Sequence, residues 1–484
     1  MKIKILIANS VGRDVKGNNY ILFPSRWTAN VGKAKSFNFY PYELAYLSSI
    51  LKREKKWSVR MVDGNYEELN WKDYFEKYKD EKPNYLVMET SSVVYKDDLR
   101  FALRFKEKYG TKLIFCGQHA TAFPKIVIRD GVDYVCIGEY EYTVLDIIRG
   151  IRQKKIKGLF PNERRELLDI NSLPFPEDDD ISRWNYNKIG GCDYKEIEFF
   201  ASRGCMMNCV FCVARQTYYQ QANFRSRNIQ NIIEEIKYLK NKYPKLEGIF
   251  FDEENHNTNK KFVLELCRAI VDNGLDDLKY DAMCGYWTLD EEMLRAMKKA
   301  GYYKIRIGIE SASPRVCQGM KKVVVVDKMV DVLKMAKKIG IRMYGTFTFG
   351  APESTLKEDH LTLKLIENLL NKDLLYDFQA SVCTPQPGTP FFEYLDKKGY
   401  LLTKDWKQYG GNTAVYEYPN YKKEEIESNM MEAYRLYLKL LIKREGYFKI
   451  LINELGRSGV KGIAVKIIDF ICNYPRPLYF RRKL

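Results

Sequence analysis

The sequence has no long hydrophobic run: nowhere in its 484 residues do apolar side chains approach 18 in succession. Because a helix needs about 20 such residues to cross a bilayer, we expect no transmembrane segment. The opening stretch MKIKILIANS has too short an apolar core for a signal peptide, and no small-residue cleavage site follows it. We therefore interpret it as a first buried strand and expect a cytoplasmic protein.

Histidine is scarce, with three residues in the whole chain, His119, His256 and His360. None lies near the clustered cysteines described below, so no histidine is available locally as a further metal ligand beside them. The fingerprint GxGxxG is also missing after the first expected strand, where residues 10–38 form a long polar segment instead. An ordinary dinucleotide site is therefore not indicated.

Clustered positive charge is absent, although the chain is basic overall. Its 80 Lys and Arg exceed its 63 Asp and Glu, which gives a formal charge of +17. The excess is spread along the chain, and no run interleaves basic residues with aromatic ones. This pattern favours a solvated, lysine-rich surface over a polyanion site, so we expect no nucleic-acid partner.

Short apolar runs alternate with amphipathic stretches over residues 1–155, which we interpret as the first domain. This alternation predicts a doubly wound, Rossmann-like parallel sheet, because parallel strands need helical crossovers. Such sheets bind ligands outside the carboxyl ends of their strands. The expected strand ends are Asn9–Ser10, Asp63–Gly64, Thr90–Ser92, Gly117–His119 and Gly138–Glu139.

Residues 156–195 contain several prolines and the acidic run EDDD, so we interpret them as a linker. A second alternating series follows over residues 196–399, with about six strand–helix units. Six units are too few for a closed eight-stranded barrel and predict an open, partial (β/α)6 barrel. The remainder, residues 400–484, is expected to be mostly helical. The predicted fold class is α/β throughout the two domains.

Eleven cysteines occur in the chain, and three of them are clustered in SRGCMMNCVFC as CxxxCxxC: Cys205, Cys209 and Cys212. A closed structural zinc site needs four ligands, and no second cysteine pair is present. Three thiolates suffice to hold three irons of a [4Fe–4S] cube and leave the fourth iron open. The pattern favours an open cluster at the end of the strand that precedes it. A non-catalytic iron–sulfur or zinc module, binding nucleic acid, is the alternative from another class.

This motif, placed after the first strand of a six-unit domain, resembles that of the radical S-adenosylmethionine (radical SAM) enzymes. Further stretches resemble the subgroup with an N-terminal cobalamin-binding domain, over roughly residues 1–400. They include PYELAYLSSILKRE, CGQHATAFP and GVDYVCIGEYEYTVLDII, then GIFFDEENH, AGYYKIRIGIES, GTFTFGAPEST and TPQPGTPFFEYL. The resemblance implies three cofactors: a [4Fe–4S] cluster on the three cysteines, SAM on the open iron, and cobalamin.

The resemblance also implies residues that meet SAM. They lie beside the cysteines or at strand ends of the second domain: Phe211, Asp252, Glu253, Glu310, Gly350 and Glu353. Phe211 is expected to shield the cluster. For the acidic residues, capping of the following helices is the alternative role.

Cobalamin domains with a histidine below the cobalt carry DxHxxG, which is missing here. Members of the resembled subgroup often bind cobalamin without that ligand, so the cofactor is still expected. The candidate contacts lie at strand ends of the first domain: Ser91, Ser92, Gly117, His119, Gly138 and Glu139. Small residues there would let the backbone approach the nucleotide tail closely.

The leading functional hypothesis is therefore a cobalamin-dependent radical SAM enzyme that methylates an unactivated carbon. A cobalamin-dependent radical oxidase or cyclase is the nearest alternative. Its partners would be a small-molecule or lipid-like substrate and a reductant such as ferredoxin or flavodoxin. Amphipathic segments with basic flanks in residues 430–484 suggest a helical cap, or alternatively contact with a membrane surface that would make the protein peripheral.

Overall fold

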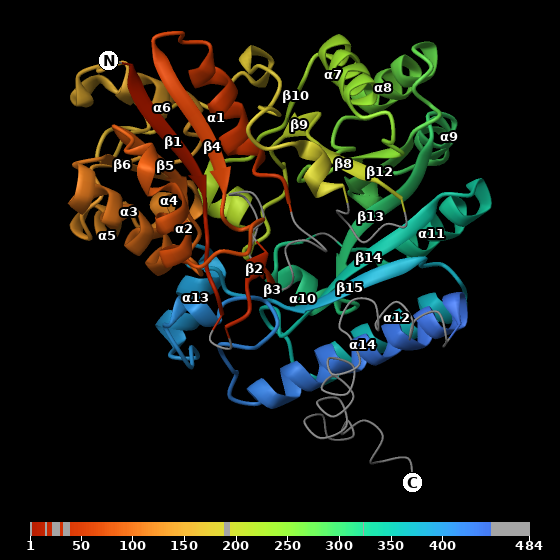
Figure 1. The fold of residues 1–484 in the computed structure, drawn as a ribbon. Coiled ribbons are helices and arrows are strands. Elements are labelled where there is room, and N and C mark those ends of the chain that lie inside the picture. Colours follow the sequence, from red (N-terminus) through yellow and green to blue (C-terminus); the bar gives the residue numbers. More distant parts are fainter. Residues whose placement is uncertain are drawn as a thin grey trace.

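The computed structural model describes residues 2–14, 17–21, 30–31, 39–187, 194–322 and 324–446. Two parallel sheets lie side by side, each accompanied by helices (Figure 1). The first is built from the N-terminal part of the chain and the second from its central part. This arrangement confirms the expected fold class.

The first sheet has five parallel strands in the order β4-β1-β5-β6-β7. Its strands are β1 (Ile3–Asn9), β4 (Trp57–Asp63), β5 (Tyr85–Glu89), β6 (Lys112–Cys116) and β7 (Tyr134–Val135). Its helices are α1 (Tyr42–Lys52), α2 (Trp71–Tyr78), α3 (Tyr95–Tyr109), α4 (Gly117–Ala122), α5 (Pro124–Arg129) and α6 (Glu141–Ile148), and β2 (Tyr20–Ile21) pairs with β3 (Asn30–Val31). The order is that of flavodoxin-like sheets, whose ligands bind where the strand order reverses, here between β1 and β5.

Both faces of this sheet are covered, which is why its central strands β1, β5 and β6 are mostly apolar. Helices α1 and α6 pack together on one face, and α2 and α3 on the other. Ile5 and Ile7 of β1 face the first layer, while Leu6 and Ala8 face the second.

Residues that connect the two sheets run through three short 3-10 turns, Gln153–Lys155, Ile170–Ser172 and Arg183–Tyr186. Arg183 anchors this connection, because its buried guanidinium donates to Glu235 of α7 (Ile229–Lys242) at 2.6 Å. The segment contacts both parts of the chain, because the Tyr186 hydroxyl donates to Asp63 at 2.6 Å and Asp178 accepts from the Tyr243 hydroxyl at 2.6 Å.

The second sheet has six parallel strands in the order β15-β14-β13-β12-β11-β8, so neighbours in sequence are neighbours in space. They are β8 (Glu196–Phe199), β11 (Gly248–Phe251), β12 (Lys279–Cys284), β13 (Tyr302–Glu310), β14 (Arg342–Phe349) and β15 (Asp377–Val382). Its further helices are α8 (Lys260–Asp272), α9 (Glu291–Lys299), α10 (Pro314–Gly319), α11 (Val326–Ile339), α12 (Leu356–Asn371) and α13 (Pro390–Lys398). The sheet curls into the expected half-barrel (Figure 1).

The faces of the half-barrel differ in polarity. In β14, Met343, Phe347 and Phe349 are buried in the core beneath the helices, while Thr346 and Thr348 on the opposite face are half-buried. This period of two places apolar side chains under the helical layer and leaves the inner face polar.

The C-terminal helix α14 (Lys423–Glu445) packs against α12, β14 and β15. Ile426, Met430, Ala433 and Leu436 bury the apolar side of this helix in the main core. No helix among the described residues is long and apolar enough to span a bilayer. Residues 447–484, on which the hypothesis of membrane contact chiefly depends, lie outside the described residues.

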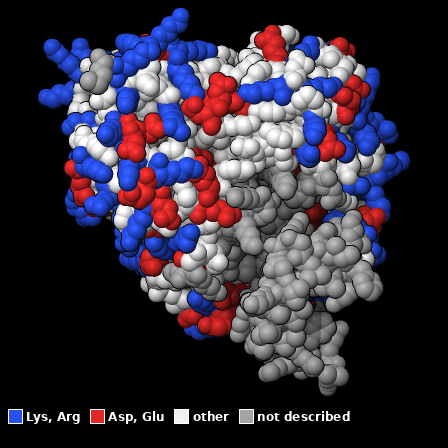
Figure 2. Space-filling view, viewed as in Figure 1, with Lys and Arg blue, Asp and Glu red and all other residues white. Residues whose placement is uncertain are grey.

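Figure 2 shows basic and acidic side chains intermixed over the visible face of the first domain, without a continuous patch of one sign. This distribution is consistent with the spread of charge in the sequence. It gives no support on that face to a polyanion-binding surface.

Candidate active site

The three clustered cysteines lie in a loop at the carboxyl end of the second sheet. The loop leaves β8 through the short strand β9 (Ser202–Arg203), which pairs with β10 (Arg225–Ser226). Gly204 has a φ of +99°, and a side chain there would collide with Asn223. Glycine at this position therefore lets the chain turn directly from the strand into the cysteine loop.

The cysteine thiols influence one another and are largely buried. Burial raises the pKa of Cys205 to about 11 and that of Cys212 to about 12, and it also raises the pKa of Cys209. Cys205 and Cys209 each raise the pKa of Cys212 further. Without a metal these groups are neutral thiols, so a bound cluster would supply the charge that makes them thiolate ligands.

No group of three or more His, Cys, Asp or Glu residues in the described ranges is gathered to hold a single metal ion. A closed, mononuclear zinc site would need such a group. A multi-iron cluster bonds each thiolate to a different iron, so its ligands do not have to converge on one point. Three cysteines in one loop match the three-thiolate ligation expected of an open [4Fe–4S] cluster.

Two acidic residues after β11 accept hydrogen bonds from the segment that leads into the cysteine loop. The Glu253 carboxylate accepts from the Ala201 N–H at 2.6 Å and the Ser202 hydroxyl at 2.5 Å. Glu254 accepts from the Gly204 N–H at 2.9 Å. Both carboxylates thus position the backbone that leads into Cys205. Sequence reasoning gave Glu253 a contact with SAM or a helix cap, and Glu254 no role.

Replacing Glu253 by alanine is expected to lower the free energy of unfolding by about 3 kcal/mol, because buried donors would lose their acceptor. Urea unfolding of the cofactor-free protein measures this. The matched control is Glu265→Ala on α8, where the carboxylate is half exposed and the change should stay within about 0.5 kcal/mol. A loss of SAM affinity without a loss of stability would contradict the positioning role.

Glu310 ends β13 in a left-handed conformation, with a φ of +62° that non-glycine residues rarely adopt. Its carboxylate pairs with the buried ammonium of Lys322 at 2.7 Å, and the Thr346 hydroxyl lies 3.4 Å away. Cys209 lies close enough for Lys322 to lower the pKa of its thiol. The structure thus brings Glu310 to the cysteine loop, together with a lysine that sequence reasoning missed.

Asp252 is buried at the end of β11 and interacts with Glu198 of β8. Burial and the nearby Asp252 raise the pKa of Glu198 well above its usual range, while the Tyr40 N–H donates to it at 3.2 Å. Two buried carboxyl groups this close favour sharing a proton over carrying two charges. Asp252 is therefore part of an acidic pair on the barrel side of the domain junction.

Gly350 and Glu353 contact residues outside the cysteine loop. The Gly350 carbonyl accepts from the hydroxyls of Tyr416 (2.5 Å) and Tyr418 (3.1 Å), and a side chain at Gly350 would collide with Tyr416. Glu353 is half exposed and pairs with Arg315 of α10 at 3.3 Å. Phe211 is half-buried against the main core. These contacts give Gly350 and Glu353 structural partners, and their roles toward SAM stay predictions.

The predicted cobalamin contacts occupy the carboxyl edge of the first sheet. His119 lies in α4, where its Nδ1 is 3.0 Å from the Ser92 hydroxyl and its ring stacks on Tyr95 at 4.0 Å. Burial lowers the pKa of His119 to about 3, so the imidazole is neutral. Trp406 packs edge-on against the ring at 5.0 Å.

Some polar atoms at this edge lack a protein partner among the described residues. They are the Ser91 hydroxyl, Nε2 of His119 and the Tyr218 hydroxyl, all buried. Gly117 has a φ of +90° as the chain enters α4. Because buried polar atoms are nearly always satisfied in folded proteins, these atoms are open to a polar ligand at this edge. The residues present therefore fit a polar cofactor such as cobalamin.

Gly138 and Glu139 connect this edge to the second domain. Gly138 has a φ of +75° and sits against the Arg164 guanidinium, with no room for a side chain. The Glu139 carboxylate pairs with Arg203 at 3.2 Å and with Arg225 at 2.8 Å, and Arg203 also pairs with Glu141 at 2.8 Å. Glu139 thus faces the strands next to the cysteine loop, a role that sequence reasoning did not give it.

The carboxyl edges of the two sheets meet through α4 and a π-helical segment, Ala214–Tyr219, that follows the cysteine loop. The Thr217 hydroxyl of this segment donates to the Gly388 carbonyl at 3.0 Å, and Gly388 packs against Ala122 of α4. The chemistry-bearing loop of one domain therefore lies beside the ligand edge of the other.

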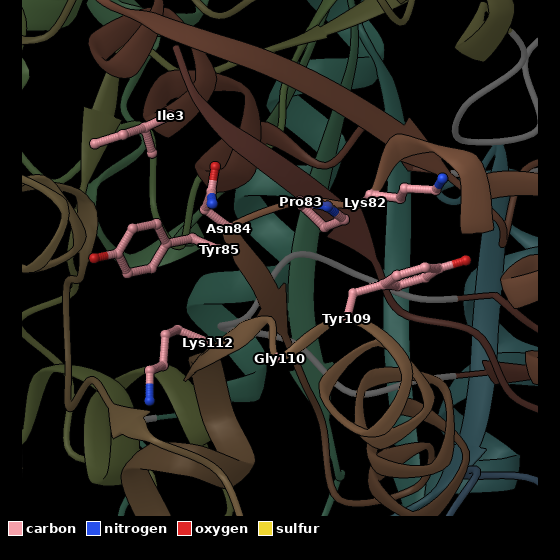
Figure 3. A pocket seen from close by; sticks show the side chains of 8 residues that line it. All are labelled: Ile3, Lys82, Pro83, Asn84, Tyr85, Tyr109, Gly110 and Lys112. Atoms are coloured by element: carbon pink, nitrogen blue, oxygen red, sulfur yellow. The ribbon is translucent and has the colours of Figure 1, made fainter. Parts of the chain in front are cut away.

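A surface pocket lies at the opposite, amino-terminal edge of the first sheet (Figure 3). It is lined by Lys82, Asn84, Tyr109 and Lys112 among others, from the residues around the starts of β5 and β6 and the end of α3. The strand direction places it a full strand length from the carboxyl edge. It therefore belongs to a different part of the molecule from the candidate active site.

Sequence reasoning missed Lys322, Arg203 and Tyr218. Their only sequence signals are a basic residue shortly after GIES, the arginine that precedes Gly204, and tyrosines downstream of the cysteines. None of these signals predicts which strand end each side chain will meet.

Residues 200–366 match the family model described as the radical SAM superfamily. The chain is 28% identical over 422 residues to an uncharacterized methyltransferase, PH0819, of Pyrococcus horikoshii, which covers 83% of this chain and 89% of the relative. The range that matches the family model, residues 200–366, contains all three clustered cysteines and Glu310.

Two solved structures are similar over most of the chain. The radical SAM methyltransferase TsrM of Kitasatospora setae, with cobalamin and a [4Fe–4S] cluster bound, has a TM-score of 0.63 at 16% identity and covers 82% of this chain and 78% of its own. The cobalamin-dependent radical SAM enzyme OxsB has a TM-score of 0.67 at 13% identity and covers 97% and 75%. Because the sequence identities are only 16% and 13%, these similarities establish that the chain shares the fold of the two structures.

Proposed function

We propose, from the match of residues 200–366 to the radical SAM superfamily and from the fold shared with its cobalamin-dependent members, that this chain methylates an unactivated carbon of a small molecule. In this proposal Cys205, Cys209 and Cys212 hold a [4Fe–4S] cluster, SAM binds at the open iron, and cobalamin lies at the carboxyl edge of the first sheet. The oxidase or cyclase reaction and the non-catalytic module are the less favoured alternatives.

One observation carries this proposal: the cysteine loop and the ligand edge of the first sheet face each other across α4 and residues 214–219. A radical generated at the loop needs a methyl donor within reach, and this edge is where flavodoxin-like sheets bind ligands. The polar atoms of Ser91, His119 and Tyr218 support a ligand there, since they have no partner among the described residues.

When bound, the cofactors supply reductive cleavage of SAM, hydrogen abstraction and the methyl group, which are chemistries that protein side chains lack. The chain's own residues position and enclose them. Glu253 and Glu254 fix the backbone from Ala201 to Gly204, which leads into the cysteine loop. Glu310 and Lys322 place one ion pair beside the cysteines, and Asp252 contributes to an acidic pair nearby.

For the substrate, we infer a polar small molecule in the half-barrel. The inner face of the sheet is lined by hydroxyl and amide groups of Thr346, Thr348, Gln379 and Ser381, which are half-buried or exposed. Such groups suit hydrogen-bonded recognition of a hydroxylated or amide-bearing compound. The reductant would be ferredoxin or flavodoxin. Contact of the tail with a membrane stays a hypothesis about residues outside those described.

The test is anaerobic purification, reconstitution with iron and sulfide, and addition of SAM, cobalamin and a low-potential reductant. We expect iron and sulfide in the protein, stoichiometric cobalamin, and formation of both 5′-deoxyadenosine and S-adenosylhomocysteine. 5′-Deoxyadenosine without S-adenosylhomocysteine would favour oxidase or cyclase chemistry. Zinc in place of iron and sulfide would overturn the proposal.

A further inference from the structure

Lys322 carries a buried positive charge beside the cysteine loop. Its ammonium lies 2.7 Å from Glu310, and both side chains are about 10% exposed. The ammonium also lies where a side chain on Gly308, near the end of β13, would meet it. A charge this deeply buried is rarely kept in a fold unless it is paired or used.

The backbone around Lys322 is tied to the cysteine loop. The Val210 N–H, between Cys209 and Phe211, donates to the Met320 carbonyl at 3.0 Å. The Lys322 N–H donates to the Cys317 carbonyl at 2.9 Å, closing the turn after α10. These bonds fix the backbone position from which the Lys322 side chain extends, and the ion pair with Glu310 holds its ammonium.

The acidic group that faces Lys322 is Glu310, whose carboxylate lies 2.7 Å from the ammonium. The segment that carries the lysine is bonded to the cysteine loop through Val210 and Met320. Lys322 is thus a largely buried positive charge, paired with Glu310, beside the loop that carries the predicted cluster ligands.

We propose that Lys322 is a positioning residue that sets the reduction potential of the cluster, with Glu310 as the opposing charge that partly offsets it. The inference deepens the proposed function and rests on it. Reduction adds one electron to the cluster, and a buried positive charge close to the ligand thiolates stabilises the reduced form. A carboxylate on the same ammonium weakens that effect. The Lys322–Glu310 pair therefore tunes how readily the cluster accepts the electron that SAM cleavage requires.

This arrangement predicts shifts of opposite sign for the two partners. In reconstituted full-length protein, Lys322→Gln should lower the ratio of reduced to oxidised cluster at a fixed potential by about tenfold, which is ~59 mV for a one-electron couple. Glu310→Gln should raise the same ratio. Lys322→Arg keeps the positive charge, so its ratio of reduced to oxidised cluster should stay close to that of the original protein.

The matched control is Lys321→Gln, which removes the neighbouring, exposed lysine charge. The measurement is a redox titration followed by electron paramagnetic resonance of the reduced cluster, with iron and sulfide assayed in every variant. Melting temperature is recorded beside it. A purely structural role for Lys322 would lower the melting temperature or the iron content without moving the potential.

The inference would be supported if the reduction potential falls in Lys322→Gln, rises in Glu310→Gln and stays unchanged in Lys321→Gln. Equal potentials in Lys322→Gln and Lys321→Gln at full iron content would overturn it. If Lys322→Gln does not retain iron, the test depends on Glu310→Gln. A more positive reduction potential in that variant would support the inference, and an unchanged potential would overturn it. Absence of any iron–sulfur cluster in the original protein would instead refute the proposed function, so the two failures are distinguishable.

Discussion

Cys209→Ala should lose the brown iron–sulfur absorbance and form 5′-deoxyadenosine only at the level of an enzyme-free control. Cys209 is the middle cysteine of the CxxxCxxC motif, between Cys205 and Cys212. A cube held by two thiolates in place of three loses one of its protein ligands. Iron and sulfide analysis with product quantification measures both effects.

The matched control is Cys267→Ala, which removes another buried thiol, in α8, far from the loop in sequence. This variant should keep its cluster and its SAM cleavage and lose about 1 kcal/mol of stability from the smaller side chain. Retained SAM cleavage in Cys209→Ala would contradict the assignment of the three ligands. Equal losses in both variants would indicate damage to the fold.

Arg203→Met is expected to lower the free energy of unfolding by about 3–5 kcal/mol, the cost of leaving buried charges without a partner. Arg203 is about 2% exposed and pairs with Glu139 and Glu141, which are equally buried. Burial raises the pKa of Glu141, while Arg203 opposes that rise. Loss of the arginine would therefore strand carboxylates at the junction between the two sheets. Urea unfolding followed by circular dichroism measures the change.

An exposed arginine provides the comparison. Arg100 of α3 pairs with Asp97 but is 56% exposed, so Arg100→Met should cost below about 1 kcal/mol. Combining Arg203→Met with Glu141→Gln should recover part of the loss, because one of the stranded charges is then removed. A cost for Arg203→Met similar to that for Arg100→Met would mean that the junction does not depend on these ion pairs.

The sequence alone predicted the fold class and the resemblance to a family of enzymes. Strands alternating with helices predict parallel sheets because a parallel crossover needs a helix, and both sheets are confirmed. The spacing of Cys205, Cys209 and Cys212 is a local property of one loop, so it carried the resemblance to radical SAM enzymes, which the match of residues 200–366 confirms. The boundaries of the domains and the site residues stay predictions.

Only the tertiary structure decided which side chains surround that loop. Strand ends predicted that Glu253, Glu310 and Glu139 would lie at ligand edges, but not what they would meet there. Glu253 holds the backbone before the cysteines, and Glu139 pairs with arginines of the other sheet. These partners are 51 to 86 residues away in sequence.

Lys322 shows the physical reason most clearly. Lys322 is one of many lysines in the sequence, and no local sequence feature distinguishes it from the adjacent Lys321. The turn after α10 exposes Lys321 and buries Lys322 against Glu310 and the cysteine loop. Hydrogen bonding and residue spacing along the chain specify elements and motifs, whereas the electrostatic surroundings of a charge depend on which distant segments fold against it.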